Sequence, residues 1–249
     1  FTYTQLGANI QRYANNLRKL GVRRGSRVAI VCQNTPDFLF ADYAVMSLGA
    51  ISVPIDEELK PAHMLRTYIN FVEPKIVLTD SENFSNVLEN TDNIPVRSFM
   101  DVRHNSEHHD PVEISENDIS TIIFSSGTSS ESDQSFKAIQ LSHGNIASNI
   151  LDCGDVLKSK KRLTYLTGIA QHSHSFEYMV QKGMLSHGML LHYTNLKSFM
   201  HGNSGEQINP DIMIMIPRVA NIFMEQIIKG IEKDKDTRIG KKVKQFFDW

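Results

Sequence analysis

The sequence of 249 residues has few cysteines, no long apolar run and almost no net charge. Its two cysteines, Cys32 and Cys153, lie far apart, which argues against a disulfide framework or a zinc ribbon and favours packed thiols in a reducing compartment. No stretch approaches the roughly 20 consecutive apolar residues that span a bilayer. With 26 Lys and Arg against 28 Asp and Glu, no basic surface for nucleic acid is expected. The composition predicts a soluble, cytoplasmic protein that binds no nucleic acid.

Natural terminal features are also missing. Phe1 follows no initiator methionine, and the first residues lack the basic and then apolar layout of a signal peptide. The other end stops on the bulky residues Phe246-Phe247-Asp248-Trp249. We therefore expect a fragment of a longer protein.

Apolar runs typical of buried strands alternate along the chain with apolar residues at helical spacing. Helices are expected from the N-cap Thr4 to Leu20, at 36–48, 61–71 and 84–88, after the N-cap Ser142, at 176–185, and from Pro217. Strands are expected at 27–32, 50–55, 75–79, 96–102, 119–124, 137–141, 162–166, 189–193 and 211–216. This alternation predicts an α/β fold with doubly wound, mostly parallel sheets and flanking helices.

A polar and acidic stretch interrupts the pattern at residues 104–118. Such a composition is typical of a surface loop or linker. It would divide a first α/β subdomain, residues 1–103, from a second and incomplete one, residues 119–249.

The segment with the clearest chemical character is a strand that runs into hydroxyl side chains around one glycine. Ser125, Ser126, Gly127, Thr128 and Ser129 follow the apolar residues 122–124. Glycine lets several backbone N–H groups converge on an anion, hydroxyls add donors, and Lys137 would add a positive charge. No G-x-x-x-x-G-K-[ST] or G-x-G-x-x-G pattern occurs. Taken alone, the segment is as consistent with a serine-rich surface loop as with a phosphate loop.

Several segments, read together and in order, resemble the adenylate-forming superfamily, which includes acyl-CoA synthetases and peptide-synthetase adenylation domains. The hydroxyl-rich loop with its later lysine is similar to that superfamily's signature [ST]-S-G-T-T-G-x-P-K-G. The segments that carry the resemblance are Thr2 to Leu6, Ala44 to Ile55, Pro74 to Asp80, Ser125 to Ser129 and Lys137 to Asn145.

Further segments resemble the long-chain acyl-CoA synthetase branch of this superfamily. They are Leu163 to Leu166, His172 to Glu177, Pro217-Arg218-Val219 and Phe246 to Trp249. The resemblance thus extends over almost the whole chain.

The resemblance implies a two-step reaction. A fatty carboxylate attacks the α-phosphorus of ATP, which is bound with Mg²⁺, and gives an acyl-adenylate and pyrophosphate. Coenzyme A then displaces AMP to form a thioester. By position, residues 125–129 and Lys137 match the loop that closes over the phosphates, and His174 matches a position near the carboxylate pocket. Taken without the resemblance, His174 is more simply a hydrogen-bonded histidine at a helix start.

The same resemblance places the adenine, ribose and Mg²⁺ residues and the C-terminal lid domain after Trp249, so we expect no metal ligand in this segment and no catalysis by the fragment alone. The expected partner is a fatty acid substrate. Peripheral contact with a membrane is a further expectation.

The loop also departs from the signature. Ser130 and Ala138 stand where glycines are expected, and the longer loop contains Glu131 and Asp133. Two carboxylates near a triphosphate repel it unless a cation intervenes. A non-catalytic relative that binds an acyl chain or a nucleotide is therefore the alternative to an enzyme.

Overall fold

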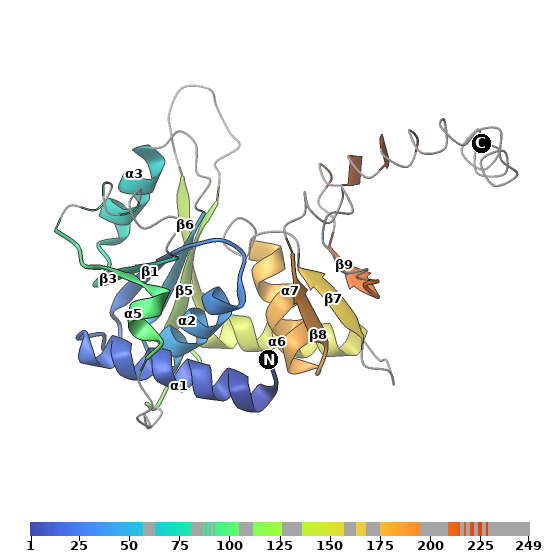
Figure 1. Ribbon diagram of the computed structural model, residues 1–249, viewed down its shortest axis with the longest axis horizontal. Helices are drawn as coiled ribbons and strands as arrows, with labels where there is room; N and C mark the ends of the chain where they lie inside the picture. Colours follow the sequence, from blue (N-terminus) through green and yellow to red (C-terminus); the bar gives the residue numbers. More distant parts are fainter. Residues whose placement is uncertain are drawn as a thin grey trace, which may run out of the picture.

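The computed structural model describes residues 1–56, 63–80, 93–104, 112–125, 136–156, 163–167, 175–194 and 209–214, with single positions between 87 and 91 and between 217 and 228. The described strands form a six-stranded sheet and a three-stranded sheet, and helices flank both (Figure 1). The expected α/β fold with mostly parallel sheets and flanking helices is confirmed.

The larger sheet has the order β4-β3-β1-β2-β5-β6, in which every pair is parallel except β5 and β6. Its strands are β1 (Arg27–Val31), β2 (Ile51–Ile55), β3 (Ile76–Thr79), β4 (Val96–Ser98), β5 (Ile119–Ser125) and β6 (Lys137–Ser142). The sheet runs across the expected boundary at 104–118, because β5 lies beside β2. The division into subdomains at that segment stays a prediction.

Helices cover both faces of the larger sheet, as the unbroken apolar run of its central strand β1 requires. On one face Val28 and Ile30 pack with α1 (Tyr3–Lys19), α2 (Pro36–Ser47) and α5 (Phe99–Val102). On the other face Ala29 and Val31 pack with α3 (His63–Val72). Because successive side chains of β1 point to opposite faces, the sheet has a separate core on each face.

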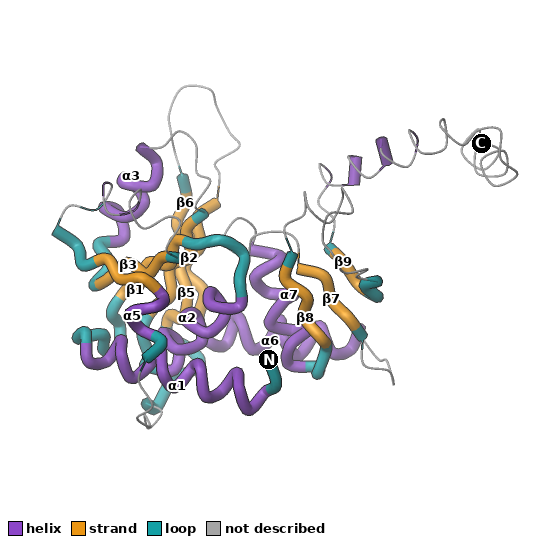
Figure 2. Tube along the Cα trace, in the orientation of Figure 1, coloured by secondary structure: helices purple, strands orange, loops and turns teal. Residues whose placement is uncertain are grey.

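The smaller sheet has the order β8-β7-β9, with all neighbours parallel. Its strands are β7 (Thr164–Thr167), β8 (Leu190–Tyr193) and β9 (Ile212–Met213). Figure 2 shows α7 (Ser175–Ser186) between the two sheets, and α7 packs against α6 (His143–Val156). Tyr178 of α7 belongs to the core of the larger sheet, whereas Val180 and Met184 belong to that of the smaller one.

Helix α1 begins two residues earlier than expected. Thr2 is its N-cap, because the Thr2 hydroxyl accepts from the Gln5 N–H at 3.3 Å while the Gln5 side chain accepts from the Thr2 N–H at 2.8 Å. In this reciprocal capping box, the side chains of Thr2 and Gln5 each accept from the backbone N–H of the other residue. These two N–H groups would lack such acceptors if Thr4 were the N-cap. Thr4 as the N-cap was therefore wrong.

The strand expected at 96–102 was also partly wrong, because β4 stops at Ser98 and α5 follows at once. The Ser98 hydroxyl accepts from the Met100 N–H, and Asp101 accepts from the Ser98 N–H. These two local hydrogen bonds start a helix in an apolar run. Most of the helix expected at 84–88, residues 215–216 and most of the helix expected from Pro217 lie outside the described residues.

None of the helices in the described ranges is both long and apolar enough to cross a membrane.

Candidate functional site

Ser125 and Lys137 lie opposite one another where β5 ends and β6 begins. The loop 126–136 connects these two residues, so both ends of the expected phosphate loop are fixed by the sheet. Because β1, β2 and β5 are parallel, this loop leaves the same edge as the carboxyl ends of β1 and β2. In open α/β sheets ligands bind outside that edge.

Of the expected site residues, the structure brings together the backbones of Ser125 and Lys137. Lys137 is exposed, and no described residue forms an ion pair with it. Its ammonium group is therefore accessible to an anion. Ser126, Gly127, Thr128, Ser129 and His174 lie outside the described residues, and their roles stay predictions.

Glu177 lies in the first turn of α7, just after the segment that contains His174, and is 1% exposed. Its Oε2 accepts a hydrogen bond of 2.6 Å from the Tyr165 hydroxyl of β7, while its Oε1 is buried without a hydrogen-bond partner. Burial raises the pKa of Glu177 to about 6, although hydrogen bonds from Tyr165 and Thr167 oppose the shift. In the sequence Glu177 stood out only as the end of the segment His172 to Glu177 that resembles the acyl-CoA synthetase branch.

A polar network joins the two sheets at their carboxyl edges. The Asn34 amide, in the connection after β1, donates to the Thr167 carbonyl at 3.0 Å and to the Thr167 hydroxyl at 3.1 Å. The Gln181 amide of α7 donates to the same hydroxyl at 3.0 Å. Thr167 is the last residue of β7 and fully buried. These bonds fix the point where the chain leaves β7 toward His174.

A second buried network includes Lys182, the residue that follows Gln181 in α7. The Lys182 ammonium and the Asp42 carboxylate of α2 form an ion pair, and both side chains are fully buried. The Tyr178 hydroxyl lies 3.1 Å from Asp42 Oδ1 and 2.8 Å from the Thr121 hydroxyl of β5. Desolvation alone would lower the pKa of Lys182, but the attraction of Asp42 outweighs it and the pKa is raised. The second sheet is thus held to the first through α7.

Sequence reasoning missed both networks. Asp42 lies in the mainly apolar stretch 38–46 of α2, and Lys182 lies between the apolar pairs Met179-Val180 and Met184-Leu185 of α7. A charged residue among apolar neighbours is the one signal in the sequence for such a network, because a buried charge requires a partner.

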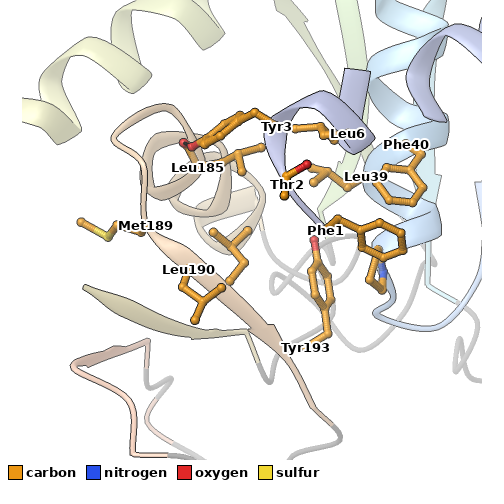
Figure 3. A pocket seen from close by; sticks show the side chains of 12 residues that line it. Phe1, Thr2, Tyr3, Leu6, Leu39, Phe40, Leu185, Met189, Leu190 and Tyr193 are labelled. Atoms are coloured by element: carbon orange, nitrogen blue, oxygen red, sulfur yellow. Dashed lines mark hydrogen bonds between the residues drawn. The ribbon is translucent and has the colours of Figure 1, made fainter. Parts of the chain in front are cut away.

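An apolar pocket of about 120 Å³ lies elsewhere on the molecule, between the start of α1, the start of α2, the end of α7 and β8 (Figure 3). Its lining includes Phe1, Tyr3, Leu39, Phe40, Leu185, Met189, Leu190 and Tyr193. Of the expected site residues that the structure describes, Ser125 and Lys137, neither lines it.

Within the described residues, no group of three His, Cys, Asp or Glu side chains is arranged to hold a metal ion.

These features define an α/β protein whose hydroxyl-rich loop leaves the carboxyl edge of its main sheet. The profile of the family described as "AMP-binding enzyme" matches residues 1–247. The chain belongs to this family of adenylate-forming ligases.

The relatives are distant and longer. The chain is 22% identical to the "probable acyl-activating enzyme 16, chloroplastic" of Arabidopsis thaliana, over 94% of this chain and 36% of that protein. A segment of 59 residues is 42% identical to crotonobetaine/carnitine–CoA ligase of Salmonella paratyphi A, covering 24% of this chain and 11% of that protein. The chain therefore spans about a third of the first relative's length.

The fold is also similar to solved structures. The N-terminal domain of FACL13 from Mycobacterium tuberculosis, solved with an inhibitor, superposes with a TM-score of 0.75 at 20% identity, over 89% of this chain and 57% of that chain. O-succinylbenzoate coenzyme A synthetase (MenE) from Bacillus subtilis, in complex with AMP, gives a TM-score of 0.73 at 17% identity, over 90% and 58%. At these identities the likeness shows the fold.

Proposed function

We propose that the protein of which this chain is a part activates a carboxylic acid with ATP. A carboxylate oxygen of the acid attacks the α-phosphorus, an acyl-adenylate forms, and pyrophosphate leaves. The observation that supports this proposal is the position of Ser125 and Lys137, which lie opposite one another at the carboxyl edge of a parallel sheet in a chain of the AMP-binding family.

In this proposal Ser125, Ser126, Gly127, Thr128 and Ser129 bind the β- and γ-phosphates through backbone N–H and hydroxyl groups. Lys137 offsets the negative charge that accumulates on the departing pyrophosphate. The exposed lysine without an ion-pair partner among the described residues fits a polyphosphate. Mg²⁺ would enter with ATP as its counterion and reduce the repulsion by Glu131 and Asp133.

The finer proposal is that the acid is a long-chain fatty acid and that coenzyme A accepts the acyl group. It is supported by the segments Leu163 to Leu166, His172 to Glu177 and Pro217 to Val219, which resemble that branch. His174 then lies near the acid carboxylate. Peripheral contact with a membrane and a cytoplasmic location belong to the same proposal.

The test is ATP–pyrophosphate exchange by the full-length protein with a panel of carboxylic acids of increasing chain length. Exchange that requires an acid is expected, with the highest rate for long-chain acids. Lys137→Ala should lower the rate about 100-fold or more, because a charge on the leaving group loses its partner. Lys75→Ala, which removes a lysine outside the site, is the matched control. Absence of exchange with every acid would overturn the proposal.

A non-catalytic relative is the second candidate. The missing glycines and the carboxylates Glu131 and Asp133 in the loop favour it. It predicts that the full-length protein binds ATP or a fatty acid in calorimetry and yet exchanges no pyrophosphate.

A further inference from the structure

An aromatic cluster lies at the two ends of the expected phosphate loop. Phe124 immediately precedes Ser125, and Phe136 immediately precedes Lys137. Two aromatic side chains of α3, Tyr68 and Phe71, pack against both of them. A helix that contributes none of the expected site residues thus contacts both strand ends from which the loop departs.

Tyr68 is at the centre of this cluster. Its ring stacks on Phe124 with centroids 4.0 Å apart and planes at 18°, and it contacts Phe136 at 4.7 Å. Phe124 and Phe136 also meet edge to face at 5.5 Å. Tyr68 is 6% exposed, whereas Phe71 is 60% exposed. Tyr68 is therefore the enclosed member, and Phe71 lies at the rim.

The register of the hairpin separates this cluster from the cation. Phe124 lies opposite Ala138, and Phe136 is two residues before Ala138, so all three are on the face covered by α3. Lys137 stands between Phe136 and Ala138 in the sequence, so its side chain is on the other face of β6. A shift of β6 by one residue would exchange the two faces. The stacking of Phe124 on Tyr68 and the tilted ring contact of Phe136 with Tyr68 oppose such a shift.

We propose that Tyr68 is a positioning residue for ATP: by stacking on Phe124 and contacting Phe136, it fixes the register in which Lys137 lies opposite Ser125. The proposal rests on the proposed function, because it concerns the same loop. Tyr68 does not touch a phosphate itself and acts through Phe124 and Phe136.

The experiment compares full-length wild type, Tyr68→Leu, Tyr68→Phe and Leu65→Ala. Leu65 is in the same helix and the same core, but outside the ring cluster, so it is the matched control. In ATP–pyrophosphate exchange, Tyr68→Leu should raise the KM for ATP about tenfold and leave the KM for the acid within about twofold. Tyr68→Phe, which keeps the ring, should restore the wild-type value.

Hydrogen exchange measured on peptides that cover residues 119–142 gives a second readout, independent of catalysis. Exchange there should be at least several-fold faster in Tyr68→Leu than in wild type, and less affected by Leu65→Ala, which opens a cavity in the same core but leaves the ring contacts in place. If Tyr68→Leu does not fold, Phe136→Leu replaces it with the same expectation. Equal KM values and equal exchange in Tyr68→Leu and wild type would overturn the proposal, as would equal effects of Leu65→Ala. A wild-type protein without pyrophosphate exchange would overturn the proposed function, while the peptide data would still decide whether Tyr68 fixes the hairpin.

Discussion

Lys182 of α7 and Asp42 of α2 form an ion pair from which solvent is excluded on both sides. The Lys182 ammonium also lies over the rings of Tyr43 and Tyr178, 4.2 and 4.3 Å from their centroids. Because α2 covers the six-stranded sheet and α7 packs on the three-stranded one, this pair ties the two sheets together. Lys182 belongs to α7, the helix that follows His174 directly in the sequence.

Lys182→Met should destabilise the protein by about 3–5 kcal/mol, because it leaves Asp42 buried without a counter-charge. The measurement is urea unfolding at neutral pH. The double variant Lys182→Met with Asp42→Leu should recover a large part of the loss, since no charge is then buried alone. Equal stability of the single variant and the wild type would mean that the pair is not buried in solution.

Glu177 should make stability depend on pH in weakly acidic solution. Its pKa is about 6 in the folded protein, against an ordinary value of 4.5, so the folded state binds the proton more tightly. Its contribution to stability is therefore full below about pH 4.5 and is lost as the pH rises to about 6, a change of about 2 kcal/mol.

Glu177→Gln removes this titration and keeps an acceptor for Tyr165. Chemical unfolding between pH 4 and 7 should show the wild type losing stability relative to the variant across that interval. Parallel profiles of wild type and Glu177→Gln would contradict the expected shift.

Gly49 lies in the connection between α2 and β2 with φ of +64°, which L side chains rarely adopt. A Cβ there would also lie 3.2 Å from Arg24 Cγ and 3.3 Å from Val112 Cγ2. Gly49→Ala should therefore cost about 1–3 kcal/mol in thermal or urea unfolding.

Gly7→Ala is the matched control for this substitution. Gly7 is inside α1, and a Cβ there meets nothing within 4 Å. Alanine should stabilise the protein at this position by about 0.5–1 kcal/mol. Opposite signs for the two substitutions are expected, and a stabilising Gly49→Ala would refute the conformational argument.

The fold could be predicted from the sequence because it depends on local patterns. Val28 to Val31 form a continuous apolar run, and a run of that kind is buried on both faces. The errors were at element ends, where one or two local hydrogen bonds decide. Thr2 rather than Thr4 caps α1, and Ser98 with Asp101 turns a strand-like run into a helix.

The candidate site was only partly predictable. Ser125 and Lys137 are recognisable from the pattern around them, and their pairing follows once β5 and β6 are antiparallel neighbours. The contacts of Tyr68 with Phe124 and Phe136 join segments far apart in sequence, so no local periodicity indicates them. The same holds for Asp42 and Lys182, which only the tertiary fold brings together.

Ser142 joins β6 to α6 and caps that helix, as the sequence indicated. Its hydroxyl accepts from the Asn145 N–H at 3.1 Å, and the Asn145 side chain accepts from the Ser142 N–H at 3.0 Å. Ser142→Ala should cost about 1 kcal/mol in urea unfolding, because a backbone N–H in the first turn loses its acceptor. Ser142→Asp keeps an acceptor at the cap and should lose less than half of that amount. Because Ser142 is at the end of β6 opposite to Lys137, neither substitution should change the KM for ATP, and a change as large as that expected for Tyr68→Leu would show that this end of the strand also sets the loop.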